Sequence, residues 1–171
     1  QALYWVLAWK DGIFSLAQSL PLHMCSLSQI GLLLGLTFKY KKVFLMLLFW
    51  GPIGGFLALL IPYFDQGIIY VLQYYIAHSL VAIVPVYLFQ NKEIKLSKNY
   101  IWKVMGISNL IVIAIFFINQ FLGSNYWYVN HIPPVHSVVS SLTLWQYILI
   151  AECLFFLLLI ALGKGYKQSK V

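Results

Sequence analysis

Long apolar runs separated by short polar connections are the feature that most constrains this chain. A helix needs about 20 apolar residues to cross a bilayer. Five runs come close to that length, and they cover approximately residues 19–38, 43–62, 68–90, 100–122 and 144–163. An earlier stretch, QALYWVLAW, reads as the end of a further helix. The pattern predicts an all-α fold, a polytopic helical membrane bundle with five full transmembrane helices plus a partial N-terminal one.

The composition also places the chain in a bilayer. Of the 171 residues, 62% are hydrophobic and only 9% are charged, whereas about a quarter of the residues of a soluble domain are charged. No repeat or low-complexity linker interrupts the apolar runs. We therefore expect residues 1–171 to form a single integral membrane domain. Because the sequence starts inside an apolar run, further N-terminal spans are expected to precede it.

The lysines predict the orientation of the bundle. All 11 basic residues are Lys, and most of them occupy every second connection between the runs. The three clusters are Lys39, Lys41 and Lys42, then Lys92, Lys95 and Lys98, then Lys164, Lys167 and Lys170. Basic loops favour the cytoplasmic side, so we expect a multi-pass cell-membrane protein whose Lys-rich loops and C-terminus are cytoplasmic. Since topology accounts for the positive charge, no nucleic-acid partner is expected.

Four runs place a polar side chain near the bilayer midplane. The rise of a helix puts Gln29, His78, Asn109 and Glu152 about 12–15 Å from the nearer end of their runs. Lipid cannot hydrogen-bond these groups, so they are expected to point inward and meet in a shared polar cavity. A charged Glu152 costs at least ~2.5 kcal/mol at that depth, and His78 is its expected partner. The structural alternative is that these groups only specify helix packing.

The segment LPLHMCSLSQI, residues 20–30, belongs beside this cluster. Helical spacing puts Cys25 and Gln29 on one stripe, with His23 and Ser26 on its flank. Pro21 suits the first turn of a helix, where its missing N–H costs nothing. If a histidine takes its proton, Cys25 can act as a nucleophile. Alternatively, Cys25 is only a small apolar side chain buried in the bundle.

Helix breakers and aromatic loops suggest where the bundle closes or bends. WGPIGG, residues 50–55, and Pro85 predict a kink or a close backbone approach, either to shape a cavity or simply to pack. In the outer loop, the aromatic run 126–128 suits a lid or an interfacial belt. The two cysteines, Cys25 and Cys153, have no Cys/His spacing typical of zinc sites, and the histidines of the outer loop lack a nearby carboxylate. No metal or other cofactor is expected.

These residues resemble a known family. LPLHMCSLSQI, VLQYYIAHSLVAIVPVYLF and LGSNYWY are similar to the bacterial YwaF-like (TP0381-type) integral membrane proteins, over nearly the whole chain. They are more distantly similar to eukaryotic transmembrane protein 164, an acyltransferase on phospholipids, and faintly to the androgen-induced membrane hydrolases. The resemblance implies that His78 is the family histidine and Gln29 the family glutamine. The implied nucleophile position is Leu22, which cannot attack a carbonyl.

Three functions remain open at this stage. The first is acyl transfer or lipid hydrolysis, with His78 as base, Cys25 or Ser26 as nucleophile and Glu152 as orienting acid. The second is a transporter or binding protein for a small or lipidic ligand. The third is a non-catalytic subunit for a membrane-protein partner. Membrane lipid is the expected partner, and the expected ligand-binding residues are His23, Gln29, Tyr75 and Asn109.

Overall fold

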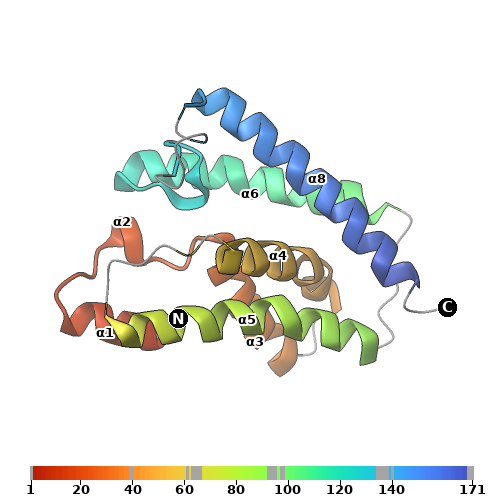
Figure 1. Ribbon diagram of the computed structural model, residues 1–171, viewed down its shortest axis with the longest axis horizontal. Coiled ribbons are helices and arrows are strands. Elements are labelled where there is room, and N and C mark those ends of the chain that lie inside the picture. The colour runs from red at the N-terminus through yellow and green to blue at the C-terminus, as the bar shows by residue number, and fades with distance from the viewer. Residues whose placement is uncertain are drawn as a thin grey trace.

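The computed structural model describes residues 2–38, 41–60, 62, 67–91, 96, 99–133, 139 and 141–168. Over these residues the protein is all-α, as the sequence predicts (Figure 1). The helices are α1 (Ala2–Lys10), α2 (Leu16–Ser19), α3 (Met24–Phe38), α4 (Lys41–Leu60), α5 (Ile68–Asn91), α6 (Tyr100–Leu122) and α8 (Leu144–Gln168), with a short 3-10 helix, η1 (Tyr126–Tyr128).

Three helices are long and apolar enough to cross a membrane. They are Ile68–Asn91, Tyr100–Leu122 and Leu144–Tyr166, and their starts coincide with those of the predicted runs. Two shorter apolar helices, Met24–Thr37 and Met46–Leu60, accompany them among the described residues. The protein is therefore a multi-pass membrane protein. The prediction of five full spans is confirmed for these three helices.

The start of α3 differs from the sequence prediction. We expected a helix from residue 19, but α3 begins at Met24, so Pro21 and His23 lie in the turn that follows α2. A distant tyrosine explains the break, because the hydroxyl of Tyr126 accepts a hydrogen bond from the backbone N–H of Leu20 at 2.9 Å. The N–H of Leu20 therefore binds this side chain and not a carbonyl within a helix. His23 consequently precedes α3 and is not one turn inside it.

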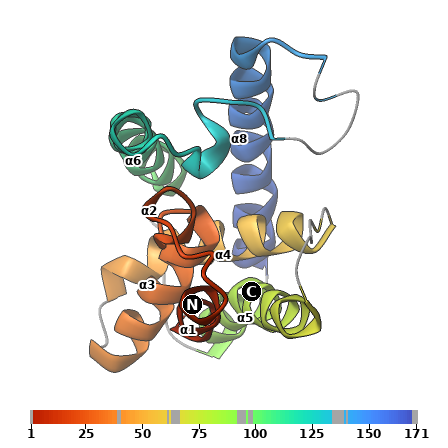
Figure 2. The ribbon, with the colours of Figure 1, turned by 90° about the vertical axis from the view of Figure 1, so that its left-hand side faces the viewer.

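Helix α4 forms the centre of the bundle. Its residues Leu47 to Ile53 are all buried, as expected of a helix that is apolar on every side and packed all round. Figure 1 shows α4 between α5 below and α6 and α8 above, and Figure 2 shows α6 and α8 on separate sides of the molecule. The position of α4 decides which residues of the other helices can meet.

Glycines let α4 approach α5 closely. A Cβ added to Gly51 would lie 2.5 Å from the carbonyl oxygen of Val81, and one added to Gly55 would lie 2.7 Å from that of His78. Only a glycine fits such spacing, in the manner of small-residue contacts between membrane helices. The sequence prediction of a close approach is confirmed. Both helices continue through their prolines, Pro52 and Pro85.

Aromatic rings pack around residues 48–50 of α4, directly before its glycines. Phe49 stacks on Tyr100 with ring centroids 5.4 Å apart, and the Tyr166 hydroxyl donates to the Leu48 carbonyl at 2.7 Å. Next to Phe49 on α4, Trp50 Nε1 donates to the Ser108 hydroxyl of α6 at 2.9 Å. These contacts join α4 to α6 and α8.

The connections alternate between two faces of the bundle. The turns around residues 11–20 and 123–133 gather at the left of Figure 1, while the end of α5, the start of α6 and the end of α8 lie at the right. Lys39, Lys92, Lys95, Lys98 and Lys170 of the predicted clusters lie outside the described residues, and the orientation that the lysines indicate stays a prediction.

We expect Gly55→Ala to destabilise the protein by about 1–3 kcal/mol, because the new methyl group would press on the α5 backbone. The measurement is the thermal unfolding midpoint in detergent. Gly165→Ala is the control, since nothing lies within 4 Å of a Cβ built there. An unchanged midpoint for Gly55→Ala would show that α4 and α5 are not held this closely.

Candidate functional site

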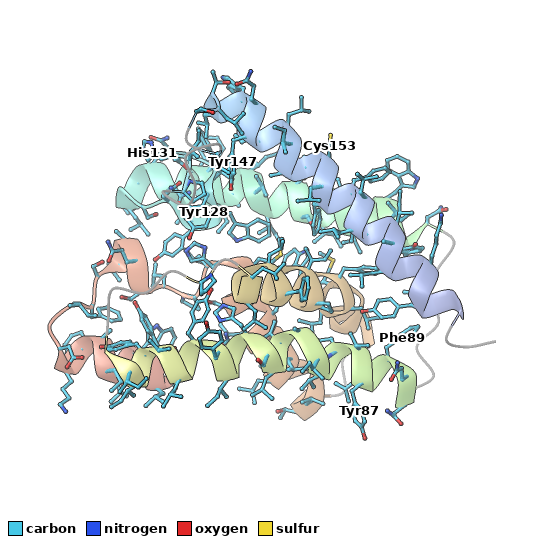
Figure 3. All side chains as sticks on the ribbon, viewed as in Figure 1. Tyr87, Phe89, Tyr128, His131, Tyr147 and Cys153 are labelled. Atoms are coloured by element: carbon cyan, nitrogen blue, oxygen red, sulfur yellow. The ribbon has the colours of Figure 1, made fainter. Side chains whose placement is uncertain are left out.

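Two histidines and a cysteine lie in one region of the bundle, where His23 is within electrostatic range of His78 and Cys25 is within that range of Tyr74 and Tyr128. His23 lies in the turn before α3, Cys25 is near the start of α3, and His78 is on α5. The three lie beneath the loop that follows α6. Figure 3 places Tyr128 of this loop between α6 and the layer of α5. The structure therefore brings together three residues that the sequence singles out.

The ring of His78 is fixed by its own helix. Its Nδ1 lies 2.8 Å from the carbonyl oxygen of Tyr74, and its ring centroid lies 4.0 Å from that of Tyr74. A carbonyl can only accept a hydrogen bond, so Nδ1 carries the proton. In the neutral ring, Nε2 then presents a lone pair.

The ring of His23 has the opposite tautomer. The backbone N–H of Trp127 donates to His23 Nδ1 at 3.4 Å, so this nitrogen is the acceptor and Nε2 carries the proton. The rings of Tyr126 and Tyr128 lie 5.1 Å and 5.5 Å from that of His23. Burial, and to a smaller extent the charge of the nearby His78, lowers the pKa of His23 to about 4. His23 is therefore a neutral donor at physiological pH.

Cys25 packs on the glycine face of α4. A Cβ on Gly54 would lie 3.0 Å from Cys25 Sγ, so the glycine leaves room for the thiol. Burial, followed by the proximity of Cys25, raises the pKa of Tyr128. Tyr74 also lies within electrostatic range of Cys25. The thiol is thus close to aromatic groups from both α5 and the loop after α6.

The loop that covers the site has a strained backbone. Trp127 and Tyr128 have φ angles of 59° and 54°, in the left-handed region that residues other than glycine rarely adopt. Trp127 Nε1 donates to the Leu22 carbonyl at 2.6 Å, and the Tyr126 hydroxyl donates to the Leu16 carbonyl at 2.8 Å. Such strain persists only where the surroundings hold it, and it concentrates at functional sites.

Asn119 of α6 holds this loop in place. Its Nδ2 donates to the Tyr126 carbonyl at 2.9 Å and to Asn130 Oδ1 at 2.8 Å. Its Oδ1 accepts from the Ser124 hydroxyl at 2.8 Å and from the Tyr126 N–H at 2.9 Å. All four hydrogen-bonding positions of a completely buried amide are therefore used.

Sequence reasoning missed Asn119 and Tyr74 as parts of the site, whereas it placed Trp127 in an aromatic run that suits a lid or an interfacial belt. The signal for Asn119 is its position four residues before Gly123, which caps α6 with a φ of 62°. A buried amide beside a helix end followed by Ser and Asn residues is typical of an ordered loop. Nothing in the local pattern indicates that this loop reaches the turn before α3.

The remaining residues of α3 and α5 that we expected at the site lie around it. Ser26 and Gln29 are partly buried on α3, and each makes a further contact. Tyr75 is exposed, and its ring meets that of Tyr74 edge-on at 5.9 Å. The carbonyl of Leu22 accepts the hydrogen bond from Trp127.

Asn109 and Glu152 do not join the histidines in the described structure. Asn109 is exposed on α6, where Ser108 points inward instead. Glu152 lies on α8, and its Oε1 is buried with no hydrogen-bond partner among the described residues. No hydrogen bond in the described part of the chain links it to His78. The pairing of these two groups stays a prediction.

The shared midplane cavity that we expected from the sequence stays a prediction. A polar cavity of about 300 Å³ lies at the C-terminal end of α6, lined by Asn119, Ser124, Asn130 and His131 among others. Across residues 2–38, 41–60, 67–91 and the other described parts, His, Cys, Asp and Glu form no group of three or more able to hold a metal ion.

Comparison with known proteins gives one match. No curated protein and no solved structure matches the chain. The sequence profile of the TMEM164 family matches residues 1–165, which is nearly the whole chain and includes every residue of the site. This bears out the resemblance to transmembrane protein 164, whereas the narrower assignment to the YwaF-like proteins stays a prediction. The chain is a member of the TMEM164 family of membrane proteins.

Proposed function

We propose that this protein cleaves or transfers an acyl ester of a membrane lipid through a thioester on Cys25, with His78 as the general base. The opposite tautomers of His23 and His78 carry the proposal. His78 Nδ1 is bound to a backbone carbonyl, which leaves Nε2 free to accept a proton. His23 accepts at Nδ1, which leaves an N–H at Nε2 to donate. A base and a neutral donor beside a thiol are the parts that acyl transfer needs.

In the first half-reaction Cys25 becomes acylated. His78 Nε2 takes the thiol proton while Sγ forms a bond to the ester carbonyl carbon of the lipid. The negative oxygen of the tetrahedral intermediate accepts a hydrogen bond from His23 Nε2–H. The C–O bond to the lipid alcohol then breaks, and the leaving oxygen takes the proton from His78. The products are a thioester on Cys25 and the free alcohol of the lipid.

In the second half-reaction a hydroxyl compound removes the acyl group. Its O–H gives its proton to His78 as the oxygen attacks the thioester, and His78 returns that proton to Sγ as the C–S bond breaks. Water as the acceptor gives hydrolysis, and a lipid alcohol gives transfer. The aromatic cover of Tyr126 and Tyr128 over His23 supports transfer, because it limits access of water.

Other expected roles change under this proposal. The Tyr74 carbonyl orients His78, which is the role expected of Glu152. Cys25 is the preferred nucleophile over Ser26, because a thiol gives up its proton to an imidazole more readily than a hydroxyl does.

A lipid-binding or transport role without bond cleavage is the second candidate function. This role is favoured by Leu22, which occupies the nucleophile position that the family resemblance implies. A family member that lost its catalytic activity would keep the lipid-binding pocket but lose the nucleophile.

We also propose that all five apolar helices cross the cell membrane, with the Lys-rich face in the cytoplasm. The alternation of the connections between two faces supports this topology. In intact cells, a membrane-impermeant maleimide is expected to label Lys10→Cys and to spare Lys164→Cys, both on exposed positions. The reverse pattern would invert the topology.

Cys25→Ala is expected to abolish acyl release and transfer, measured in proteoliposomes with a phospholipid that carries a labelled ester-linked acyl chain. His78→Gln should lower the rate about 10²- to 10⁴-fold, because it removes the general base. Cys153→Ala, at an exposed position of α8, is the matched control and should keep full activity. Turnover that survives Cys25→Ala would refute the thioester. If the wild type binds lipid without turnover, the second candidate function holds.

Stability should decrease as the pH falls from about 6.5 towards 4. The unfolded chain protonates His23 with a pKa near the ordinary 6.5, while the folded protein resists protonation until about 4. Between these two pH values the unfolded state therefore binds about one more proton than the folded state. The free energy of unfolding decreases as the pH falls, with the slope that one proton gives. His23→Gln keeps an acceptor for the Trp127 N–H and should lose this part of the slope in denaturation series. An identical slope in both proteins would contradict the burial of His23.

A further inference from the structure

The polar cavity at the C-terminal end of α6 is separate from the residues of the proposed acyl transfer. Its polar side chains that are available to a ligand belong to Gln120, Ser124, Asn130 and His131. Figure 3 places His131 near the end of α6 and the start of α8. The described lining includes neither Cys25 nor the two histidines of the acyl chemistry. The cavity is therefore a second candidate site.

The cavity lies at the depth of lipid headgroups. Helix α6 has 23 residues and is thus about 34 Å long, slightly more than the hydrocarbon core of about 30 Å. Its C-terminal end therefore reaches a surface of the bilayer. Phe116 also lines the cavity and lies one turn further into α6 than Gln120. The lining is polar at the membrane surface and apolar below it.

The buried amide of Asn119 fixes which hydrogen-bonding groups the cavity offers. Its Nδ2 donates to the Tyr126 carbonyl and its Oδ1 accepts from the Tyr126 N–H, so the amide has only one orientation. The Ser124 hydroxyl must then donate to Asn119 Oδ1, and Asn130 Oδ1 must accept from Asn119 Nδ2. A lone pair of Ser124 Oγ and the N–H groups of Asn130 Nδ2 remain for a ligand.

Gln120 and His131 add groups of both kinds. The described part of the chain gives the exposed side chain of Gln120 no hydrogen bond. The hydrogen bonds of His131 use its backbone N–H and carbonyl, both with Asn125. An amide and an imidazole can each donate and accept. A matching ligand therefore presents several groups that donate and accept, which is the property of hydroxyl groups.

The surroundings of the cavity disfavour a charged ligand. Residues 116–144 contain no Lys, Arg, Asp or Glu, so this segment offers no fixed charge to pair with an ion. The C-terminal end of a helix carries a negative partial charge, which opposes the binding of a phosphate or sulfate group. A cation would find no carboxylate in this segment and would face the N–H groups of Asn130. An uncharged ligand meets neither obstacle.

We propose that this cavity binds an uncharged polyhydroxyl group, as carried by the sugar headgroup of a glycolipid or by a free sugar. Its volume of about 300 Å³ equals that of about ten water molecules. This is at the lower end of the range for ligand pockets, so one headgroup fits. Ligand hydroxyls donate to Ser124 Oγ and accept from Asn130 Nδ2, and Phe116 contacts the apolar part of the molecule. The proposal does not depend on the acyl chemistry.

Native mass spectrometry of the detergent-solubilised protein, titrated with lipids of matched acyl chains, tests the ligand class. Monogalactosyl diacylglycerol is expected to bind about tenfold more tightly than phosphatidylcholine, which has no hydroxyl groups, because several hydrogen bonds are gained. Methyl galactoside should compete only weakly, since it lacks the part that enters the membrane. Competition as strong as that of the galactolipid would assign the site to a soluble sugar and still support hydroxyl recognition. Equal binding of both lipids, or no binding of either, would overturn the proposal.

Two variants locate the binding in the cavity. Gln120→Leu and Ser124→Ala should each weaken galactolipid binding about threefold to tenfold, as the loss of one hydrogen bond does. Gln18→Leu is the matched control, because Gln18 is an exposed glutamine of α2 on the same face of the bundle, and it should keep full affinity. The thermal unfolding midpoint of Gln120→Leu should stay unchanged, which separates lost binding from misfolding. Unchanged affinity in both cavity variants would refute binding at this place.

Discussion

The close contact between α4 and α5 is the constraint on which the rest of the structure depends. Gly51 and Gly55 bring the backbones together at Val81 and His78, and this fixes the part of α5 that carries the histidine. Gly54, between them, leaves room for Cys25 of α3. One short glycine-rich segment therefore sets the positions of the Cys25 thiol and of the part of α5 that carries His78. The contact that packs α4 against α5 is therefore also the contact that positions the residues of the candidate site.

The cover over the site is built differently, from hydrogen bonds and not from close packing. Asn119 uses its whole amide to hold the loop around Tyr126. Tyr126 in turn binds the backbone of α2, and Trp127 binds that of the turn before α3. These bonds hold two residues in left-handed conformations. The same contacts set the tautomer of His23. A loop far away in the sequence thus determines which ring nitrogen of His23 carries the proton.

The sequence predicted the long helices well and the facing of their side chains poorly. Helices α5, α6 and α8 start where their apolar runs start, because length and hydropathy alone define a span. The start of α3 was misplaced because a tertiary bond from Tyr126 to Leu20 ends the helical pattern. Helical rise gave the depth of Asn109 but not its direction, since a helix that is apolar all round carries no strong signal of which side faces inward. His23, Cys25 and His78 were found because polar groups in apolar runs are rare.

The most direct test of the account is peptide-resolved mass spectrometry of the protein after incubation with an ester-linked phospholipid. The account predicts an acyl group on the peptide that contains Cys25, which hydroxylamine removes and which accumulates when no hydroxyl acceptor is supplied. An unmodified Cys25 in a protein that turns lipid over, or an acyl group on another residue, would contradict it.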